Sequence, residues 1–583
     1  MNSIPSAKRT SPNRIGTARA ILFYSIVAGL WLAVLVRASA DDTRSTAKSN
    51  PSKKSTALSL IGKAEDADQV ITINERLSEK WKANKLTPSA RCSDYEFIRR
   101  ASVDIIGRIA KPEEIARFFK DPEGTRRALL IENLLAKEEY AKNWANIWNV
   151  WLMTRSGANT PGEAIYHEQM HKWLEEQFAK NGASFKDIVT ELLTATGKTN
   201  ENGAVNYILA HLGEPNPTGK EMEEGKFNMV PLTSRTTRLF LGLQTQCAQC
   251  HAHPFNKDWK QQHFWGVNAF FRQVDTPRGR PNSGRMAMAP VLELTDNPAF
   301  NSEAIIFYEQ RNGVVLPTKP VFLDGSKPAG GNRRSELAKF ITENPYFPKA
   351  YVNRIWAHFF GRGFTSPIDD FGPENLPSHP ELLEELSAQF KHYGYDPRRL
   401  MRWICNSDAY QLSSVANTTN DKVEAEPFFS RMLLKALSPE QLFESLIVAT
   451  QAEMFESRDN RKKIREAWIR NLTTSFGDDE GNEVTFNGTV VQALMMMNGG
   501  DIHESISSTK KGTVALAIVT KRTPHAIIHQ LYMSALNRPP TDKESDRIVQ
   551  IFKSAPAKSK DALSLWQDLF WALLNSNEFI LNH

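Results

Sequence analysis

The stretch RRALLIENLLAKEEYAKNWANIWNVWLM, residues 126–153, decides the expected fold class of this chain. Its large apolar side chains recur mainly at intervals of three or four residues, a spacing that places them on one face of α-helix. A face this rich in leucine and tryptophan is expected to be buried against other helices. The positions that form the stripe are Leu130, Leu134, Tyr140, Trp144, Trp148 and Trp151. The stretch therefore predicts a mainly α protein.

Helix start and stop signals on both sides of this stretch agree with a mainly α fold. Ser93 opens a capping box with Glu96, and the helix that follows is expected to stop at Gly107. Pro112, followed by two acidic residues, opens another helix, because proline and acids suit a first helical turn. Further helices are predicted after Ser378-His379-Pro380-Glu381, over residues 524–535 and over residues 563–579.

Between residues 275 and 330 the pattern changes from helices to strands. Gly, Pro and Asn become frequent, and the short apolar runs 291–294 and 314–316 are typical of strands. Two other breaks in helical periodicity lie near residues 413–426 and 477–501. We therefore expect two helical domains, a cytochrome-like one over residues 71–275 and a C-terminal one over residues 331–583. A strand-bearing connector over residues 276–330 would join them.

The first 40 residues predict export. Basic residues up to Arg19 precede an apolar run over residues 21–36, and Ala38-Ser39-Ala40 suits a signal peptidase. Arg37, beside this site, leaves an uncleaved single membrane anchor as the alternative. Residues 41–70 contain much Ser, Thr, Lys and Ala and read as a flexible linker. The protein is therefore expected in the periplasm or at the cell surface, with any membrane contact only through an uncleaved N-terminal segment.

The charge distribution argues against a nucleic-acid partner. The 583-residue chain has a formal net charge of +6, but five basic and no acidic residues lie in the first 40. The remaining body is close to neutral and has no global field that would attract phosphate.

Four cysteines hold the most specific signal in the sequence. Two of them lie in Cys247-Ala248-Gln249-Cys250-His251, the C-x-x-C-H pattern of covalent haem attachment. Two thiols one turn apart can form thioethers to the two vinyl groups, and the next imidazole can bind the iron as proximal ligand. Attachment of c-type haem takes place outside the cytoplasm, which agrees with the predicted signal peptide. The pattern predicts a haem c cofactor bound by Cys247, Cys250 and His251.

Other readings of the same motif remain open. Cys247, Cys250, His251 and His253 could hold zinc, because thiolates and imidazoles are its usual ligands. The two cysteines could also form a disulfide in an oxidising compartment, or a thioredoxin-like redox pair. For a haem, the candidate sixth ligands are Met286, Met288, His263, His358 and His379.

A second metal motif is H-E-x-x-H at His167-Glu168-Gln169-Met170-His171. On a helix this spacing puts two imidazoles on one face, with the glutamate as a base. Glu191, on the next predicted helix, would be the third zinc ligand of a zinc-dependent hydrolase. The alternative is an incidental match on an amphipathic helix whose histidines face solvent.

A third candidate cluster contains Asp369, Asp370, Glu374 and His379. Three carboxylates with an imidazole nearby could form an acid–base or metal group. A capped, solvated loop is the competing interpretation. The sequence alone assigns no catalytic residue.

The residues from Cys247 to Phe271, CAQCHAHPFNKDWKQQHFWGVNAFF, resemble the planctomycete exported cytochrome-like domain. FIRR at 97–100 and DIIG at 104–107 fit the same family. The second half resembles the domain of unknown function that usually follows it. The segments that carry this likeness are VNRIWAHFFGRG (352–363), PIDDF (367–371), SHPELL (378–383), YQLSS (410–414), LNRPP (536–540) and NSNEF (575–579).

The resemblance implies an exported protein of unproven biochemical role, whose cytochrome label derives from the C-x-x-C-H element. Members are often found in surface-polysaccharide or sulfatase gene settings, which suggests a cell-surface glycan as a partner besides an electron-transfer partner. Two classes of function follow. One is an exported redox protein with a c-type haem; the other is a zinc-dependent hydrolase, or a scaffold with only a structural metal site.

Overall fold

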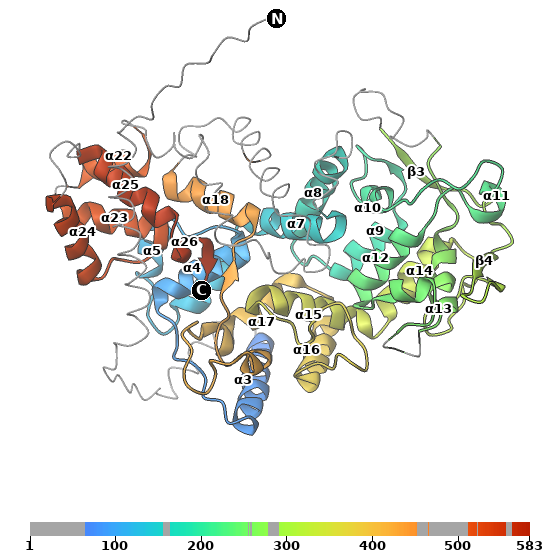
Figure 1. Ribbon diagram of the computed structural model, residues 1–583, viewed down its shortest axis with the longest axis horizontal. Helices are drawn as coiled ribbons and strands as arrows, with labels where there is room; N and C mark the ends of the chain where they lie inside the picture. Colours follow the sequence, from blue (N-terminus) through green and yellow to red (C-terminus); the bar gives the residue numbers. More distant parts are fainter. Residues whose placement is uncertain are drawn as a thin grey trace, which may run out of the picture. The chain divides into compact units, whose positions relative to one another are not determined.

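The computed structural model describes residues 64–154, 164–254, 256, 259–277, 291–451, 465, 511–521, 523–554 and 562–583. Over these ranges the chain is mainly helical with a few short strands, as the sequence predicts (Figure 1). The predicted signal peptide, most of the linker and the break at 477–501 lie outside the described residues. Within the described ranges, no helix combines the length and the apolar character that a membrane crossing requires.

The described residues fall into two compact units. The larger unit contains those between 64 and 445, together with Arg465, Asn582 and His583. The smaller unit contains those between 446 and 451 and between 511 and 581. The described part of the strand-bearing segment 276–330 therefore lies inside the larger unit.

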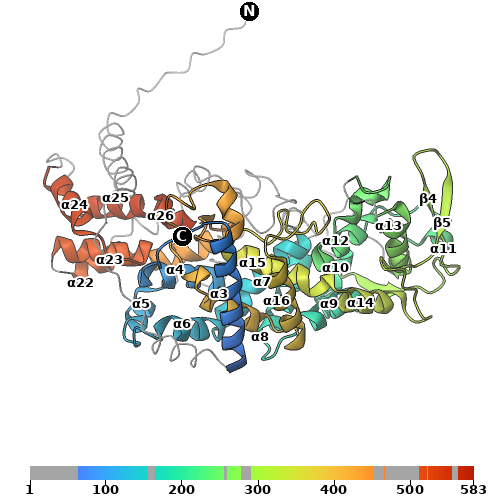
Figure 2. The ribbon, with the colours of Figure 1, turned by 90° about the horizontal axis from the view of Figure 1, so that it is seen from below.

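The larger unit is built mostly from helices. Helix α15 contacts both α12 and α16, and α16 lies beside it in two perpendicular views (Figures 1 and 2). The helices of this unit are α3 (Ala64–Ala83), α4 (Asp94–Ile106), α5 (Pro112–Phe118), α6 (Arg126–Leu135), α7 (Glu138–Met153), α8 (Ala164–Ala179), α9 (Phe185–Thr194), α10 (Val205–Ala210), α11 (Glu221–Glu224), α12 (Val230–Leu241), α13 (Gln261–Asn268), α14 (Arg333–Glu343), α15 (Tyr346–Phe360), α16 (Pro380–His392) and α17 (Pro397–Asn406). Short 3-10 helices are η2 (Thr245–Gln249), η3 (Ala269–Phe271), η4 (Ala409–Gln411) and η5 (Val423–Phe428).

The tryptophan-rich stripe lies in the core of the larger unit, as predicted. Its six apolar positions are all buried, although two helices, α6 and α7, carry them instead of one continuous helix. The Trp148 ring is stacked on Tyr351 of α15 with a centroid separation of 5.8 Å. Trp144 packs edge-on against His358 of the same helix. Aromatic packing between α7 and α15 therefore ties the two halves of the sequence together.

The predicted start and stop of α4 are confirmed. The Ser93 hydroxyl accepts a hydrogen bond from the backbone N–H of Glu96 at 3.1 Å, and Gly107 ends the helix in the left-handed conformation, with φ of 75°. Helices also form after Pro112 and Pro380. At the second of these the N-cap residue is His379, which makes no side-chain capping bond.

Residues 64–70, expected to belong to the flexible linker, instead form the start of α3. Asp66 explains the difference, because its buried carboxylate accepts a hydrogen bond from the Trp403 indole N–H at 2.7 Å. Arg399 and Arg402 of α17 lie 3.7 Å from the same carboxylate. These contacts come from residues more than three hundred positions away, so local composition does not reveal them.

A buried polar group, which we call the Asp104 cluster, joins several distant segments of the larger unit. It consists of Asp104 with Tyr410, Lys435 and Asn582, whose side chains donate to its carboxylate at 2.7, 2.8 and 2.7 Å. His358 lies beside them, with its Nε2 3.1 Å from the Asp104 carbonyl oxygen. Burial lowers the pKa of Lys435, but the carboxylate beside it favours the charged form.

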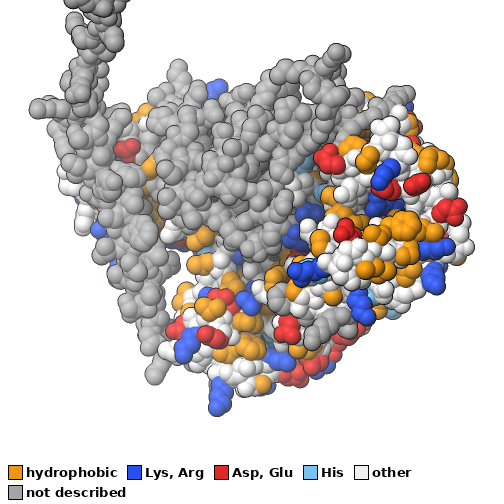
Figure 3. All heavy atoms as spheres, turned by 45° about the vertical axis from the view of Figure 1, so that its right-hand side comes forward, with side chains coloured by type: hydrophobic (Ala, Val, Ile, Leu, Met, Phe, Trp, Pro, Cys, Tyr) orange, Lys and Arg blue, Asp and Glu red, His pale blue; other side chains and the backbone are white. Residues whose placement is uncertain are grey.

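The two apolar runs predicted to be strands, 291–294 and 314–316, overlap β3 (Glu293–Asp296) and β5 (Val315–Thr318), whereas β1 (Gly197–Lys198) lies outside the predicted segment. β3 pairs antiparallel with β1 and with β2 (Val274–Asp275). β4 (Ile306–Glu309) and β5 form a hairpin in which Phe307 faces Pro317. Phe307, Val314 and Val315 are exposed, and apolar side chains gather on this side of the larger unit (Figure 3).

The smaller unit is helical in its described part and contains the segments LNRPP and NSNEF. Arg538 of the first lies between two carboxylates: it donates to Glu544 at 2.9 Å and also to Glu578 of the second. The helices of the smaller unit are α22 (Gly512–Thr520), α23 (Pro524–Leu536), α24 (Asp542–Ser554), α25 (Ala562–Leu574) and α26 (Asn577–Ile580). Helix α18 (Pro439–Thr450) begins in the larger unit and ends in the smaller one. The remaining strands are β6 (Lys435–Ala436) and β7 (Leu581–Asn582).

Candidate functional site

The C-x-x-C-H segment follows directly from the end of α12. Gly242 ends that helix with φ of 65°, and the chain then turns into η2, which contains Cys247. The hydroxyls of Thr237 and Thr245 lie 2.7 Å apart and fix η2 against α12. On the other side, the Gln249 carbonyl accepts hydrogen bonds from Gln261 and Trp265 of α13. The motif therefore lies on a short turn that is held from both sides.

Cys247 and Cys250 differ from the other two cysteines in their exposure. Both are exposed free thiols, whereas Cys92 and Cys405 are buried free thiols. Burial raises the pKa of Cys92 and of Cys405, which makes these two poor nucleophiles. The pair in the motif is therefore the accessible pair of this chain.

His251 is oriented by the backbone carbonyl of the next residue, Ala252. Its Nδ1 lies 2.6 Å from the Ala252 carbonyl oxygen, a partner that only a protonated Nδ1 can use. In that tautomer Nε2 carries the lone pair, as an iron-ligating or zinc-ligating imidazole requires. Two accessible thiols followed by a histidine in this tautomer form a donor set that fits a c-type haem.

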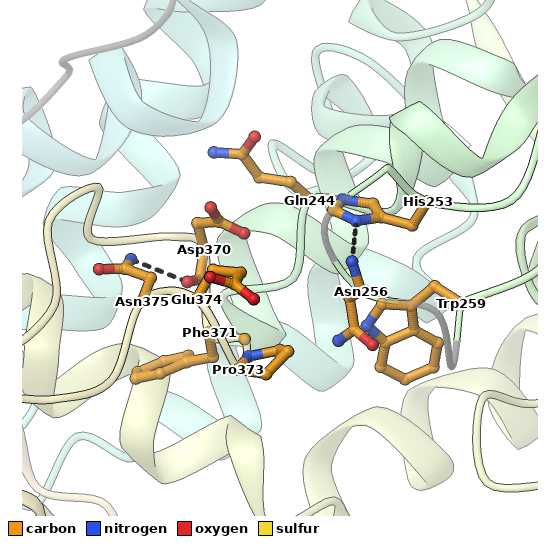
Figure 4. Close-up of a pocket in the computed structure, with 10 residues that line it drawn as sticks. Gln244, His253, Asn256, Trp259, Asp370, Phe371, Pro373, Glu374 and Asn375 are labelled. Atoms are coloured by element: carbon orange, nitrogen blue, oxygen red, sulfur yellow. Dashed lines mark hydrogen bonds between the residues drawn. The ribbon is translucent and has the colours of Figure 1, made fainter.

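His253 does not share the environment of the two cysteines. It is buried, its Nδ1 accepts the backbone N–H of Asn256 at 3.0 Å, and its own backbone N–H donates to the Trp259 carbonyl at 2.8 Å. Its ring lines a pocket that it shares with Asn256 and Trp259 (Figure 4). Among the described residues there is no group of three or more His, Cys, Asp or Glu side chains arranged to hold a metal ion.

The opposite wall of this pocket comes from the PIDDF segment and the residues after it. Asp369 anchors that wall: it is buried, accepts a hydrogen bond from Arg238 of α12, and accepts another from Gln244 at 3.3 Å. Arg354 of α15 lies 3.7 Å from the same carboxylate. Asp369 is therefore fully engaged in holding the two walls together and does not line the pocket.

Asp370 and Glu374 line the pocket and face His253 and Asn256 across it (Figure 4). Partial burial raises the pKa of Asp370, while His253 opposes this shift and Asp369 adds to it. Asn375 shapes the wall, because its amide donates to the carbonyls of Pro367 and Asp370 at 2.9 Å each. The cluster expected from sequence thus separates into an anchor, Asp369, and two lining carboxylates.

His379, expected beside these carboxylates, lies elsewhere. Its ring packs among Phe364, Phe428 and Phe429, its Nδ1 lies 2.9 Å from the Ser378 hydroxyl, and its Nε2 is buried. Burial lowers the pKa of His379 to about 4. It belongs to an aromatic cluster and does not line the pocket, so the expectation of an acid–base group that includes His379 is wrong.

The other candidate sixth ligands are engaged or fall outside the described residues. His358 lies in the Asp104 cluster, and burial lowers its pKa to about 4. His263 accepts the backbone N–H of Lys260 at 3.0 Å at the start of α13. Met286 and Met288 lie outside the described ranges.

The H-E-x-x-H histidines are on α8, but they do not share one solvent-exposed face, and the side chain of His171 is only 24% exposed. His167 is buried, and burial together with Arg465 and Lys142 lowers the pKa of His171 to about 4. Helix α8 packs along α7, and Lys142 of α7 is close enough to His171 to contribute to the shift of its pKa. The Glu191 carboxylate accepts a hydrogen bond from the indole N–H of Trp173 at 3.3 Å. The nearby cations do not favour a divalent metal at His171.

Two segments of the chain match families. Residues 72–276 match PSCyt2, described as "Protein of unknown function (DUF1549)", and residues 333–552 match PSD1, described as "Protein of unknown function (DUF1553)". The chain carries a PSCyt2 domain followed by a PSD1 domain. This order is the one that the resemblance to the planctomycete cytochrome-like domain and its partner implies. The chain matches no curated protein and no solved structure.

The pocket is therefore built by both domains. His253, Asn256 and Trp259 belong to the PSCyt2 domain, and Asp370 and Glu374 belong to the PSD1 domain. Sequence reasoning identified both segments but treated them separately, and it missed Gln244, Asn256 and Trp259. Asn256 and Trp259 lie in the polar stretch that follows the cysteines, and Gln244 lies just before the cysteines. These positions do not indicate which segment forms the opposite wall of the pocket.

Proposed function

We propose that this protein is an exported haem protein, with a c-type haem attached through Cys247 and Cys250 and with His251 as the proximal iron ligand. The observation that carries the proposal is the accessibility of this one thiol pair: Cys247 and Cys250 are exposed and free, and Cys92 and Cys405 are buried. Thioether formation needs two free thiols that the vinyl groups can reach, and Cys247 and Cys250 are the exposed thiols among the four cysteines.

The orientation of His251 supports the same proposal. With Nδ1 donating to the Ala252 carbonyl, Nε2 is the ring nitrogen that is left for the iron. A bound haem would supply one-electron transfer, and the residues of this chain would fix the ring and limit access to it. The electron partner would be another exported protein, and a cell-surface glycan is the alternative partner.

A denaturing gel stained for haem tests the attachment. The protein is produced with its signal segment in cells that have haem-attachment machinery, and we expect a stained band because thioethers survive denaturation. Replacing both Cys247 and Cys250 with Ser should remove the stain. Cys92→Ser is the matched control, since it also removes a thiol but should leave the stain unchanged.

His251→Ala separates ligation from attachment. We expect a haem that remains covalent but has an altered absorption spectrum, or a protein that fails to mature. A wild-type protein without a Soret band but with one equivalent of zinc would contradict the haem proposal. It would favour a structural zinc site at the same cysteines, or a zinc-dependent hydrolase if His171→Ala and not Cys250→Ser released the metal.

Export is proposed from the N-terminal sequence. N-terminal sequencing of the secreted protein should give a start near Asp41. An intact Met1 would instead favour the single membrane anchor at the periplasmic or cell surface.

A further inference from the structure

The Asp104 cluster has no role in the haem proposal, although it brings a lysine and an asparagine onto one oxygen atom. Oδ1 of Asp104 accepts hydrogen bonds from Nζ of Lys435 at 2.8 Å and from Nδ2 of Asn582 at 2.7 Å. Lys435 lies in β6 and Asn582 in β7, and these two strands are hydrogen-bonded to each other. An amine and a side-chain amide from distant parts of the sequence are therefore held against one carboxylate.

The Lys435 amine is fixed in position, and burial shifts it toward its neutral form. Its Nζ donates hydrogen bonds to the carbonyl oxygens of His358 at 2.7 Å and of Phe359 at 2.9 Å. Burial lowers the pKa of Lys435, although the Asp104 carboxylate opposes this shift. When one proton passes from Nζ to Asp104, the other two stay on these carbonyls and the nitrogen gains a lone pair. A neutral amine in this position is a nucleophile.

The Asn582 amide has one unsatisfied atom. Its Oδ1 is buried and has no hydrogen-bond partner, an arrangement that costs stability and calls for an explanation. Once Asp104 carries a proton, it can donate a hydrogen bond to this oxygen after a half-turn of the amide. That hydrogen bond draws electron density from Cγ of Asn582 and makes the carbon a better electrophile. The Tyr410 hydroxyl keeps the carboxylate oriented by donating to its Oδ2 at 2.7 Å.

The surroundings of the cluster keep out water, which would otherwise compete with the amine. Asp104 and Asn582 are buried. The Tyr410 ring contacts Phe359 and Phe360 at centroid separations of 5.7 and 6.2 Å. Groups that are held together in a dry interior react much faster than the same groups in solution, because little motion and no desolvation is left to pay for.

We propose that Lys435 and Asn582 become joined by an isopeptide bond, with Asp104 as the catalytic proton carrier. In the unlinked form that the structure shows, Nζ of Lys435 is ready to attack Cγ of Asn582. The Nζ–Cγ bond forms and the Cγ–Nδ2 bond breaks. Asp104 passes two protons from Nζ to Nδ2, which leaves as ammonium, and Asp104 ends as a carboxylate. No atom is oxidised or reduced, and no other reactant is needed. The bond would fix β7 covalently to β6.

Tryptic peptide mapping of the denatured full-length protein by mass spectrometry tests for the bond. Trypsin should not cleave after a linked Lys435, so residues 432–458 should stay intact and carry residues 561–583 as a branch. The branched peptide should be lighter than its two parts by one ammonia. Neither part contains a cysteine, so the result does not depend on whether haem is attached.

Three variants assign the roles within the cluster. Lys435→Arg and Asn582→Ala each remove one of the two linked groups and should give separate peptides. Asp104→Asn keeps both linked groups and the shape of the side chain, but it removes the proton carrier and should also abolish the link. Asn575→Ala is the matched control, because it removes another amide from the same C-terminal peptide and should leave the link in place.

Three outcomes would overturn the proposal. The first is a wild-type protein in which trypsin cleaves after Lys435 and residues 561–583 appear as a free peptide. The second is a link from Lys435 to residues 101–108, which would place the bond on Asp104 and not on Asn582. The third is a link that persists in the Asp104→Asn variant, since the carboxylate would then have no part in the reaction.

Discussion

The Asp104 cluster and the pocket at Asp370 both centre on a carboxylate, but their surroundings are opposite. Asp104 is 1% exposed and accepts hydrogen bonds from three side chains that come from three distant segments. Asp370 is only partly buried and opens onto a pocket that it shares with Glu374 and His253. The first carboxylate has its hydrogen-bonding capacity filled by the protein, whereas the second is placed where an external group can reach it.

This difference shows that the segments of family resemblance serve two purposes. DIIG, VNRIWAHFFGRG and YQLSS supply Asp104, His358 and Tyr410, and these residues meet in the interior. PIDDF and the cysteine segment meet at the surface pocket. Long similar segments therefore do not by themselves indicate chemistry, because part of them holds the fold together.

Asp104→Ala should have the largest effect on stability. It would leave the Lys435 ammonium buried without its carboxylate, and breaking a buried ion pair in this way costs about 3–5 kcal/mol. Chemical denaturation of the larger unit, followed by tryptophan fluorescence, measures the change. A loss of stability below about 1 kcal/mol would contradict the structural role of Asp104 and, with it, the contrast with Asp370.

Acid should destabilise the larger unit through its buried histidines. The pKa of His379 is about 4 in the folded protein against an ordinary value of 6.5, so the unfolded state takes up a proton first as the pH falls. Stability should therefore be complete above about pH 6.5 and decline between pH 6.5 and pH 4. His379→Phe should reduce this decline by about 2–3 kcal/mol.

The control for the pH series is His392→Phe, at the exposed end of α16. It should leave the slope of stability against pH unchanged. An identical slope in the wild type and in the His379 variant would show that the ring is not buried as a neutral group.

Gly242→Ala should disturb the joint between the two domains. Its φ is 65°, and an added Cβ would lie 2.6 Å from a ring carbon of Phe371. We expect a loss of about 1–3 kcal/mol, from backbone strain plus the clash. Gly313→Ala is the matched control, since its φ is 79° but nothing lies within 4 Å of the added atom. Equal losses in the two variants would mean that Phe371 does not pack closely against this turn.

Asp370→Asn should have the smallest effect on stability, within about 0.5 kcal/mol of the wild type. Its side chain is partly exposed, and the contact with Asn375 uses its backbone carbonyl, which the substitution keeps. Thermal unfolding at pH 7 measures the difference. A loss comparable to that of Asp104→Ala would indicate that Asp370 is structural.

The helices and the cysteine motif could be predicted from the sequence because their signals are local. The three- to four-residue spacing from Leu130 to Trp151 and the cap at Ser93 both depend on neighbours within a few positions. Residues 64–70 at the start of α3 are expected in the linker instead, because Asp66 is held by Trp403, far away in sequence.

The pocket could not be predicted because its walls are more than a hundred residues apart. Nothing local in PIDDF indicates that Asp369 will bind Arg238 or that Asp370 will face His253. The environment of the α8 histidines could not be predicted for a related reason. One apolar face was visible from Trp173 and Leu174, but packing of a second helix against the other face leaves no periodic signal.

A pyridine haemochrome spectrum of the purified full-length protein tests the central claim most directly. The protein must come from cells that export it and attach c-type haem. The account predicts the spectrum of a haem bound through two thioethers, at one equivalent per chain, and its absence from the double Cys247→Ser and Cys250→Ser variant. A wild-type protein that is folded, exported and free of haem would contradict it.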